Sequence, residues 1–204
     1  MPPFIVNKLD IDVHDIADTV FELKRYWIPR ADEFEFYTLG RNAYLDGKTS
    51  SYYEEPRTLN PILLCKFGSL YQKVIKHLSE QFNEPIAISD KLALPSFHIF
   101  ESSIFLLTHA GVWHYDYPHI TLGLGDVDPY TFTVAIKLPT GGAGLDYIED
   151  DQYKYLEYKE GEIIGHDGKT LHRISSLKSC VPREYRITFQ GHLIRINGIL
   201  NMFW

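Results

Sequence analysis

Trp113-His114-Tyr115-Asp116-Tyr117 is the segment around which we expect the fold to be organised. In an extended strand alternate side chains share a face, so His114 and Asp116 point one way and the aromatic side chains point the other. One imidazole nitrogen and one carboxylate oxygen on the same face form part of a metal site. A second histidine from another strand would complete a set of two histidines and one carboxylate, which binds one side of an octahedral metal ion and leaves the other side open.

The third ligand would come from one of the later histidines, which are His119, His166, His172 and His192. His119 has the opposite parity along the strand and follows a proline, so we predict a turn residue. His166 lies in a turn rich in glycine and aspartate, which predicts an exposed side chain. His192 lies late in the last predicted strand and has no identifiable partner. His172 follows a strand-turn unit that would deliver it to the start of a second strand, and it is the preferred ligand.

The composition limits the class of protein. A chain of 204 residues is long enough for one domain with a sizeable core. The hydrophobic fraction of 45% and the charged fraction of 23% are those of a globular protein. The formal net charge of -7 argues against nucleic-acid partners, because nucleic acids are bound by Lys and Arg side chains that displace counterions.

The cysteines and the N-terminus bear on the compartment. Cys65 and Cys180 are the only cysteines, one in a predicted helix and one in a polar loop, so we expect no disulfide framework. The N-terminal segment lacks a basic stretch followed by a long apolar run, and no apolar run approaches the length of a membrane span. We therefore expect a cytoplasmic protein with no membrane partner, and the oligomeric state stays open.

The first half of the chain predicts two helices. From Asp10 to Ile28 apolar residues recur every three or four positions, and Pro29 ends the pattern. Asn60-Pro61 is typical of a helix start, and an apolar stripe follows it. Between these helices, residues 31–37 alternate as a short strand. Residues 41–57 have no period and are predicted to form a surface loop that covers a substrate.

From Leu94 onward the sequence changes to short β-rich runs separated by Gly, Pro and Asp. The predicted strands are residues 96–101, 104–108, 112–117, 120–123, 131–138, 144–148, 161–165, 170–175 and 185–193. This pattern indicates the α+β class, with an antiparallel sandwich or barrel that carries the helices on one outer face. No repeat or linker divides residues 1–204, so we expect a single domain with helical support in about 1–93 and a β core in about 94–193.

The last predicted strand carries a charged residue on its polar face. Parity places Arg186, Thr188 and Gln190 on one face of this strand. If that face points into the barrel, the guanidinium of Arg186 would bind a ligand carboxylate through two hydrogen bonds, and the Thr188 hydroxyl would add a third. The alternative is a solvated outer face.

Five short motifs follow one another in the second half of the chain. They are His114-x-Asp116, Gly141-Gly142-Ala143-Gly144-Leu145, Gly161-Glu162-Ile163-Ile164, Leu171-His172-Arg173 and Arg186-x-Thr188. In order and approximate spacing, the segment from about Leu94 to Leu193 resembles the Fe(II)/2-oxoglutarate-dependent dioxygenase family. The resemblance implies a double-stranded β-helix (jelly-roll) core braced by the N-terminal helices. It also implies an enzyme that uses Fe(II), 2-oxoglutarate and O2.

On this resemblance, His114, Asp116 and His172 are the catalytic residues that hold the iron. Arg186, with Thr188, would bind the distal carboxylate of 2-oxoglutarate. The interval between His172 and Arg186 is long for the family, and some members use a lysine from a middle strand instead. Lys137 is therefore the alternative anchor, although a lysine at a strand end can also extend into water.

The expected reaction is hydroxylation, or another oxidation, of a small molecule. An apolar wall around the reacting bond could be formed by Trp113, Tyr115, Tyr117, Tyr147 and Phe189. The tyrosine-rich segments 44–53 and 147–158 could form a lid over an amino-acid-like or cationic substrate, or a solvated loop.

Other classes of protein stay open. A protein or peptide hydroxylase would use the same chemistry on a larger substrate. A cupin-like metal-binding or isomerase domain shares a β-barrel and a histidine-rich site, but it has no reason to place an arginine beside the metal. A zinc hydrolase would also use three protein ligands, and it would need a carboxylate general base, for which the sequence offers only Glu162.

Overall fold

The computed structural model of the protein describes residues 3–89, 91–125 and 127–204. Its helices are α1 (Val13–Glu22), α2 (Ala43–Asp46), α3 (Ser51–Glu54), α4 (Pro56–Phe82), α5 (Ile104–Thr108) and α6 (Pro118–Leu122), with a 3-10 turn η1 (Lys24–Tyr26). Its strands are β1 (Ile5–Lys8), β2 (Ile28–Pro29), β3 (Phe36–Leu39), β4 (Ile86–Ile88), β5 (Ser96–Glu101), β6 (Tyr130–Lys137), β7 (Gly144–Glu149), β8 (Gln152–Glu157), β9 (Glu162–His166), β10 (His172–Ile174), β11 (Tyr185–Ile196) and β12 (Ile199–Phe203).

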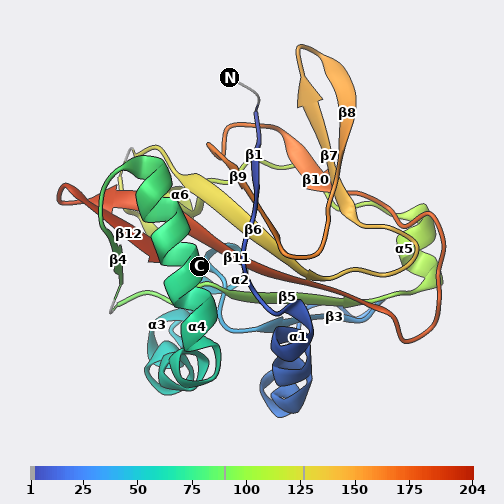
Figure 1. Ribbon diagram of the computed structural model, residues 1–204, viewed down its shortest axis with the longest axis horizontal. Helices are drawn as coiled ribbons and strands as arrows, with labels where there is room; N and C mark the ends of the chain where they lie inside the picture. Colours follow the sequence, from blue (N-terminus) through green and yellow to red (C-terminus); the bar gives the residue numbers. More distant parts are fainter. Residues whose placement is uncertain (1–2, 90, 126) are drawn as a thin grey trace.

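In the described residues these strands form two sheets (Figure 1). The larger sheet has the order β1-β9-β6-β11-β5-β3-β2, with β12 paired to β11 and β4 paired to β12. The smaller sheet has the order β10-β7-β8. The pairings within both sheets are antiparallel except for β12 with β4. The predicted α+β class with a largely antiparallel sheet is confirmed.

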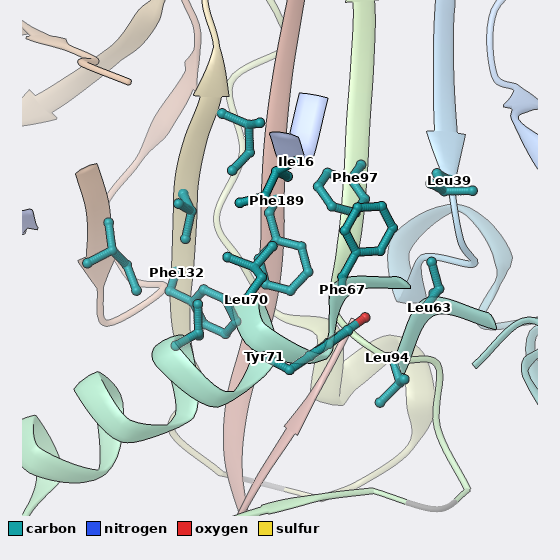
Figure 2. Packing of buried hydrophobic residues seen from close by; sticks show 14 of the residues in the cluster. Ile16, Leu39, Leu63, Phe67, Leu70, Tyr71, Leu94, Phe97, Phe132 and Phe189 are labelled. Carbon is teal, nitrogen blue, oxygen red and sulfur yellow. The ribbon is translucent and has the colours of Figure 1, made fainter. Parts of the chain in front are cut away.

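Side chains alternate along the central strand β6 and divide the interior into two parts. Phe132 and Val134 belong to the main hydrophobic core, which also contains the buried faces of α1 and α4. Figure 2 shows Phe67 and Tyr71 of α4 packed against the aromatic residues of the central strands. Thr131 and Thr133 face the opposite side and line a cavity between the two sheets. Helices α1 and α4 therefore cover one face of the larger sheet, and the polar groups of the cavity lie on the other face.

Three segments that were predicted as strands have other structures. Residues 104–108 form α5 and residues 118–122 form α6, so both strand predictions are wrong. Apolar runs of four or five residues are too short to distinguish a strand from one helical turn, and the decisive signals were Pro118 at the helix start and Gly123 with φ +66° after its end. Residues 112–117 are extended but pair only through an isolated bridge at His114.

Helix α4 begins five residues before the predicted start. Pro56 occupies its first turn, and Pro61 lies inside it. The Asn60 side chain does not cap the helix; it donates to the carbonyl of Leu92 and accepts from the amide of Leu94. An Asn-Pro pair usually indicates an N-cap hydrogen bond from the Asn side chain, and here a tertiary contact takes its place.

The first helix and the first predicted strand are also displaced. The segment from Asp10 to Ile28, predicted as one helix, forms α1 and η1 and ends in β2, and the strand predicted at residues 31–37 lies at 36–39 as β3. The segment 41–57, predicted as a loop, contains α2, α3 and the start of α4.

Several strands lie outside the predicted β core. Residues before Leu94 contribute β1 to β4 to the larger sheet, and β12 follows β11 at the C-terminal end. The segment 147–158, proposed as a lid, is part of the β7–β8 hairpin, whose turn residues Asp150 and Asp151 have φ of 51° and 59°. In the part of the chain that the structure describes, no helix combines the length and apolar character needed to cross a bilayer.

Candidate active site

His114 and His172 are held together by their own backbones. The amide of His114 donates to the carbonyl of His172 at 2.9 Å, and the amide of His172 donates back at 3.1 Å. This reciprocal pair joins the extended segment 112–117 to β10 and brings the centres of the two imidazole rings to 4.4 Å. The predicted convergence of two histidines from separate segments is therefore present.

Asp116 completes the group from the same segment as His114. Its amide donates to the carbonyl of Gly168 at 2.9 Å, in the turn between β9 and β10. Its carboxylate oxygens lie 3.7 Å from Nε2 of His114 and 3.7 Å from Nε2 of His172. One ligand atom from each of the three residues lies within 4.8 Å of the others, which is the spacing of a metal site. The structure therefore brings the side chains of His114, Asp116 and His172 together, and their role as metal ligands stays a prediction.

The hydrogen bonds of the two imidazoles leave their metal-facing nitrogens free. Nδ1 of His114 lies 2.8 Å from the carbonyl of Val112, and Nδ1 of His172 lies 2.8 Å from the carbonyl of Thr170. A carbonyl only accepts hydrogen bonds, so both Nδ1 atoms carry the proton. In the neutral ring Nε2 then has a free lone pair, which points toward Asp116 and can bind a metal.

His166 was predicted to be an exposed turn residue, and that prediction is wrong. The residue is the last of β9, pairs with Thr131 of β6 and is buried. Its Nδ1 accepts from the amide of Gly168 at 3.2 Å, so the proton of the neutral ring is on Nε2. Nε2 lies 3.4 Å from Oδ2 of Asp116. His166 therefore carries its proton on the nitrogen that lies nearer the carboxylate, whereas His114 and His172 present lone pairs.

The charges of the group favour metal binding. Burial lowers the pKa of His172 and lowers the pKa of His166 to about 3, so both rings are neutral at pH 7. Burial opposes the ionisation of Asp116, but the histidines around it, His172 first, hold the pKa of its carboxyl well below its usual range. One carboxylate and neutral imidazoles are the protonation states that a divalent metal requires.

Tyr44 reaches the site from the segment that was predicted as a loop. Its hydroxyl donates to Oδ1 of Asp116 at 3.1 Å, and burial, with the charge of Asp116, raises its pKa well above the usual range. Helix α2 is fixed by Asp46, which accepts hydrogen bonds from Arg30 at 2.7 and 2.9 Å and from Arg41 at 2.9 Å. The predicted loop is therefore a short helix anchored by ion pairs, and its role in covering a substrate stays a prediction.

Arg186 lies on the interior face of β11, as parity predicted. It is 3% exposed, and its guanidinium lies between the rings of Phe100 and Tyr158, at 5.8 and 5.4 Å. Nη1 donates to the Thr188 hydroxyl at 3.4 Å. Nε and Nη2 are buried and have no hydrogen-bond partner among the described residues. Buried guanidinium donors without partners are rare, so this arrangement fits an anion that binds there.

A small cavity supports that interpretation. About 20 Å³ of space adjoins Arg186, and its lining includes Ser102, whose buried hydroxyl also has no partner in the described part of the chain. Ile174, at the end of β10, lines this space and also the cavity of about 110 Å³ that contains the three metal-ligand side chains. A carboxylate on Arg186 would therefore lie on the same side of the sheet as the metal group.

Lys137 does not share the face of the sheet that carries Arg186. A register shift in the β6–β11 pairing places Lys137 opposite Ile187, whereas Ala135 lies opposite Thr188. Ile187 belongs to the core beneath the helices, so the bulge turns Lys137 away from the face that carries Arg186. Simple parity along β6, which grouped Lys137 with Thr133, could not reveal this shift.

Comparison with solved structures gives the fold. No protein-family model matches the sequence, and no curated protein matches it. An N-substituted L-amino acid dioxygenase from Burkholderia ambifaria AMMD aligns over 99% of this chain and 86% of that chain, with 15% identity and a TM-score of 0.61. The same enzyme in complex with alpha-KG gives a TM-score of 0.62 at 14% identity, with the same coverage. The chain has the fold of the 2-oxoglutarate-dependent oxygenases.

A third solved structure agrees. The non-heme alpha-ketoglutarate-dependent carbocyclase SnoK from nogalamycin biosynthesis aligns over 95% of this chain and 82% of that chain, with 11% identity and a TM-score of 0.52. These solved structures agree with the fold that the resemblance implied.

Sequence reasoning found some parts of the site and missed others. The residues that it singled out as metal ligands, His114, Asp116 and His172, lie together in the structure, and Arg186 lies on the interior face that strand parity predicted. It missed Tyr44 and His166, whose positions depend on tertiary packing. Of the five aromatic residues expected in the wall, Tyr115 lines a groove beside the site, and Phe189 is buried in the core against α4.

Proposed function

We propose that the protein is a non-haem Fe(II)/2-oxoglutarate-dependent oxygenase that hydroxylates, or otherwise oxidises, a small molecule. The observation that carries the proposal is the metal-ligand group of His114, Asp116 and His172, together with Arg186 on the same face of the sheet, where its Nε and Nη2 have no hydrogen-bond partner among the described residues. We also propose that the two sheets are the halves of a double-stranded β-helix braced by α1 and α4. A single domain and a cytoplasmic location stay predictions.

Each residue has a role in this proposal. His114, Asp116 and His172 hold Fe(II) on one side and leave the opposite side for the co-substrate, O2 and the substrate. Arg186 binds the distal carboxylate of 2-oxoglutarate, and Thr188 orients the guanidinium through Nη1. When bound, the iron couples the oxidation of 2-oxoglutarate to succinate and CO2 with the transfer of one oxygen atom of O2 to the substrate. Tyr44 donates to Asp116 and fixes the orientation of that carboxylate.

The test is an anaerobic titration with Fe(II) and 2-oxoglutarate, monitored by the visible charge-transfer absorption of the iron–2-oxoglutarate chelate. The band should form with wild-type protein and with the control His14→Ala, which removes an exposed histidine of α1. It should be lost in His172→Ala. Absence of the band in wild type, or an unchanged band in His172→Ala, would refute the proposal.

A second titration separates the two candidate anchors. Arg186→Ala should weaken 2-oxoglutarate binding by about 2 to 5 kcal/mol, because a buried charge loses its partner. Lys137→Ala should leave the affinity unchanged. The assignment of the anchor is wrong if the lysine variant is the one that loses affinity.

The buried arginine also bears on the alternatives. A cupin-like binding or isomerase domain has no use for a buried guanidinium with two free donors on the metal side of the sheet, so this observation does not favour that reading. Turnover assays with a small molecule and with a peptide that carries the same reacting group would separate a small-molecule enzyme from a peptide hydroxylase.

A further inference from the structure

An apolar groove adjoins the candidate metal centre. It has a volume of about 680 Å³, and it shares Asn42, Tyr44, His98, His114 and Ile174 with the cavity that holds the metal-ligand group. The His114 side chain is 46% exposed, whereas those of Asp116 and His172 are 6% exposed. The ligand group is therefore open on the side that faces this groove.

Aromatic rings from three segments form part of the groove wall. Phe36 of β3 stacks on Phe100 of β5, with ring centres 4.2 Å apart and planes 3° apart. Phe34 stacks on Phe105 of α5 at 4.8 Å, and Phe105 stacks on His109 at 4.1 Å. A wall of stacked rings offers contact area without charge, and it excludes water from what lies against it.

Exposed apolar side chains continue the groove to the surface. Leu45 of α2 is 49% exposed, Val112 is 84% exposed and Tyr115 is 43% exposed, and all three line the groove. Exposed apolar side chains that cluster around a concave pocket are typical of a binding site.

Charged side chains are missing from the lining. Among the residues of the described chain that line the groove, none is Asp, Glu, Lys or Arg. Arg30 and Arg41, which reach α2, are both paired with Asp46. Arg186 lines a different cavity, where we assign it to 2-oxoglutarate. A ligand carboxylate or ammonium group in this groove would lose its water without gaining a partner of opposite charge, which is unfavourable.

We propose that this groove binds the molecule that is oxidised, and that this molecule is uncharged and largely apolar. The inference rests on the proposed function and narrows it. The volume lies within the range of about 300 to 1,000 Å³ that suits a whole small ligand. This substrate class differs from the amino-acid-like substrate that the sequence suggested. An amino acid would bring two charges to a groove whose lining contains no Asp, Glu, Lys or Arg among the described residues.

Equilibrium dialysis with a matched pair of probes tests the substrate class. The probes are 2-naphthol, which is neutral, and naphthyl-L-alanine, which carries the same ring and the charges of an amino acid. The protein is loaded anaerobically with Fe(II) and excess 2-oxoglutarate, so that Arg186 is not available to the amino acid. 2-Naphthol should bind at least about tenfold more tightly. Equal or tighter binding of naphthyl-L-alanine would overturn the inference.

A pair of exposed valines tests the location. Val112→Asp adds a charge at the groove rim, and Val181→Asp adds the same charge at a site that is 42% exposed and is not part of the groove lining. Both positions are on the surface, so neither change should prevent folding. Val112→Asp should weaken 2-naphthol binding by about threefold or more, and Val181→Asp should not. Equal effects of the two variants would contradict the assignment of the groove.

The two proposals can fail separately. If the chelate does not form, binding of 2-naphthol to the two valine variants still tests the groove, because the groove is formed by protein side chains alone. The chelate absorption decides whether the protein holds Fe(II) and 2-oxoglutarate, and the dialysis decides which molecules the groove accepts. A normal chelate band together with a preference for the charged probe would overturn only the substrate class.

Discussion

His114, His172 and His166 differ in which ring nitrogen carries the proton. The first two face backbone carbonyls through Nδ1, whereas His166 faces the amide of Gly168. The backbone thus fixes the role of each ring before any metal binds. Two rings become ligands through Nε2, and the third presents an Nε2–H to Oδ2 of Asp116 at 3.4 Å.

His166→Ala should therefore weaken metal binding by about tenfold, because the ligand carboxylate loses a positioning donor. His166→Gln should retain most of the affinity, since its amide can donate from a similar position. Anaerobic calorimetry with Co(II) measures both variants. If glutamine is as harmful as alanine, His166 is itself a ligand or a purely structural residue, and the positioning role is wrong.

At the scale of elements, the turn between β9 and β10 positions the carboxylate. Gly168 has φ +75°, and a Cβ built on it would lie 2.7 Å from the carbonyl oxygen of Asp116. The same glycine accepts the Asp116 amide and donates to His166. A side chain at this position would push the ligand strand away from the turn.

Gly168→Ala should lower the free energy of unfolding by more than Gly198→Ala does. Gly198 has φ +81° with open space around its Cβ position, so its variant measures the cost of the backbone conformation alone, about 1 to 2 kcal/mol. Gly168→Ala should cost about 1 to 3 kcal/mol more because of the contact. Urea unfolding measures the free energy of unfolding of both variants. Equal decreases would show that the β9–β10 turn accommodates the added methyl group without strain.

Side-chain alternation along a strand can be predicted from the sequence, but the pairing of that strand with its neighbours cannot. Alternation placed His114 with Asp116 and Arg186 with Thr188, because side-chain parity is a local property. It failed for Lys137, since a bulge in the pairing with β11 is set by the neighbouring strand. His166 was misassigned because its turn residues were visible in the sequence and its burial by β6 was not.

At the scale of the whole molecule, long-range convergence is the main feature that local patterns miss. The groove wall combines Phe36, Phe100 and Phe105, which come from three elements. In the sequence each of these residues lay in a predicted strand, and nothing indicated that their rings would meet. An ion-pair network similarly joins α2 to Arg30, beside the edge strand β2, through Asp46, and it holds Tyr44 over the site.

This network predicts a dependence of stability on pH. Burial opposes ionisation of Asp46, but hydrogen bonds from Arg30 and from the Asn42 amide lower its pKa below the usual value. The unfolded chain therefore binds a proton more readily, so the stabilisation is present above about pH 4 and is lost as pH falls through the lower folded pKa. Asp46→Asn should flatten the acid limb of the stability curve. Parallel curves for wild type and Asp46→Asn in acid unfolding would contradict this.

Metal binding should couple the site to the stability of the whole chain. The ligand group joins the segment 112–117 to β10 and the β9–β10 turn, and these contacts are absent in the unfolded chain, so a metal that binds the folded state stabilises it. At free Mn(II) about 100 times the dissociation constant, the gain is about 2.7 kcal/mol. For a chain of this size, that gain raises the melting temperature by about 5 to 10 °C.

The shift should disappear in His114→Ala and after addition of a chelator, and it should persist in the control His14→Ala. Differential scanning calorimetry measures each case. A shift of the same size in His114→Ala would mean that the metal binds elsewhere, because removal of one of three ligands leaves too few protein donors to hold the ion at this concentration.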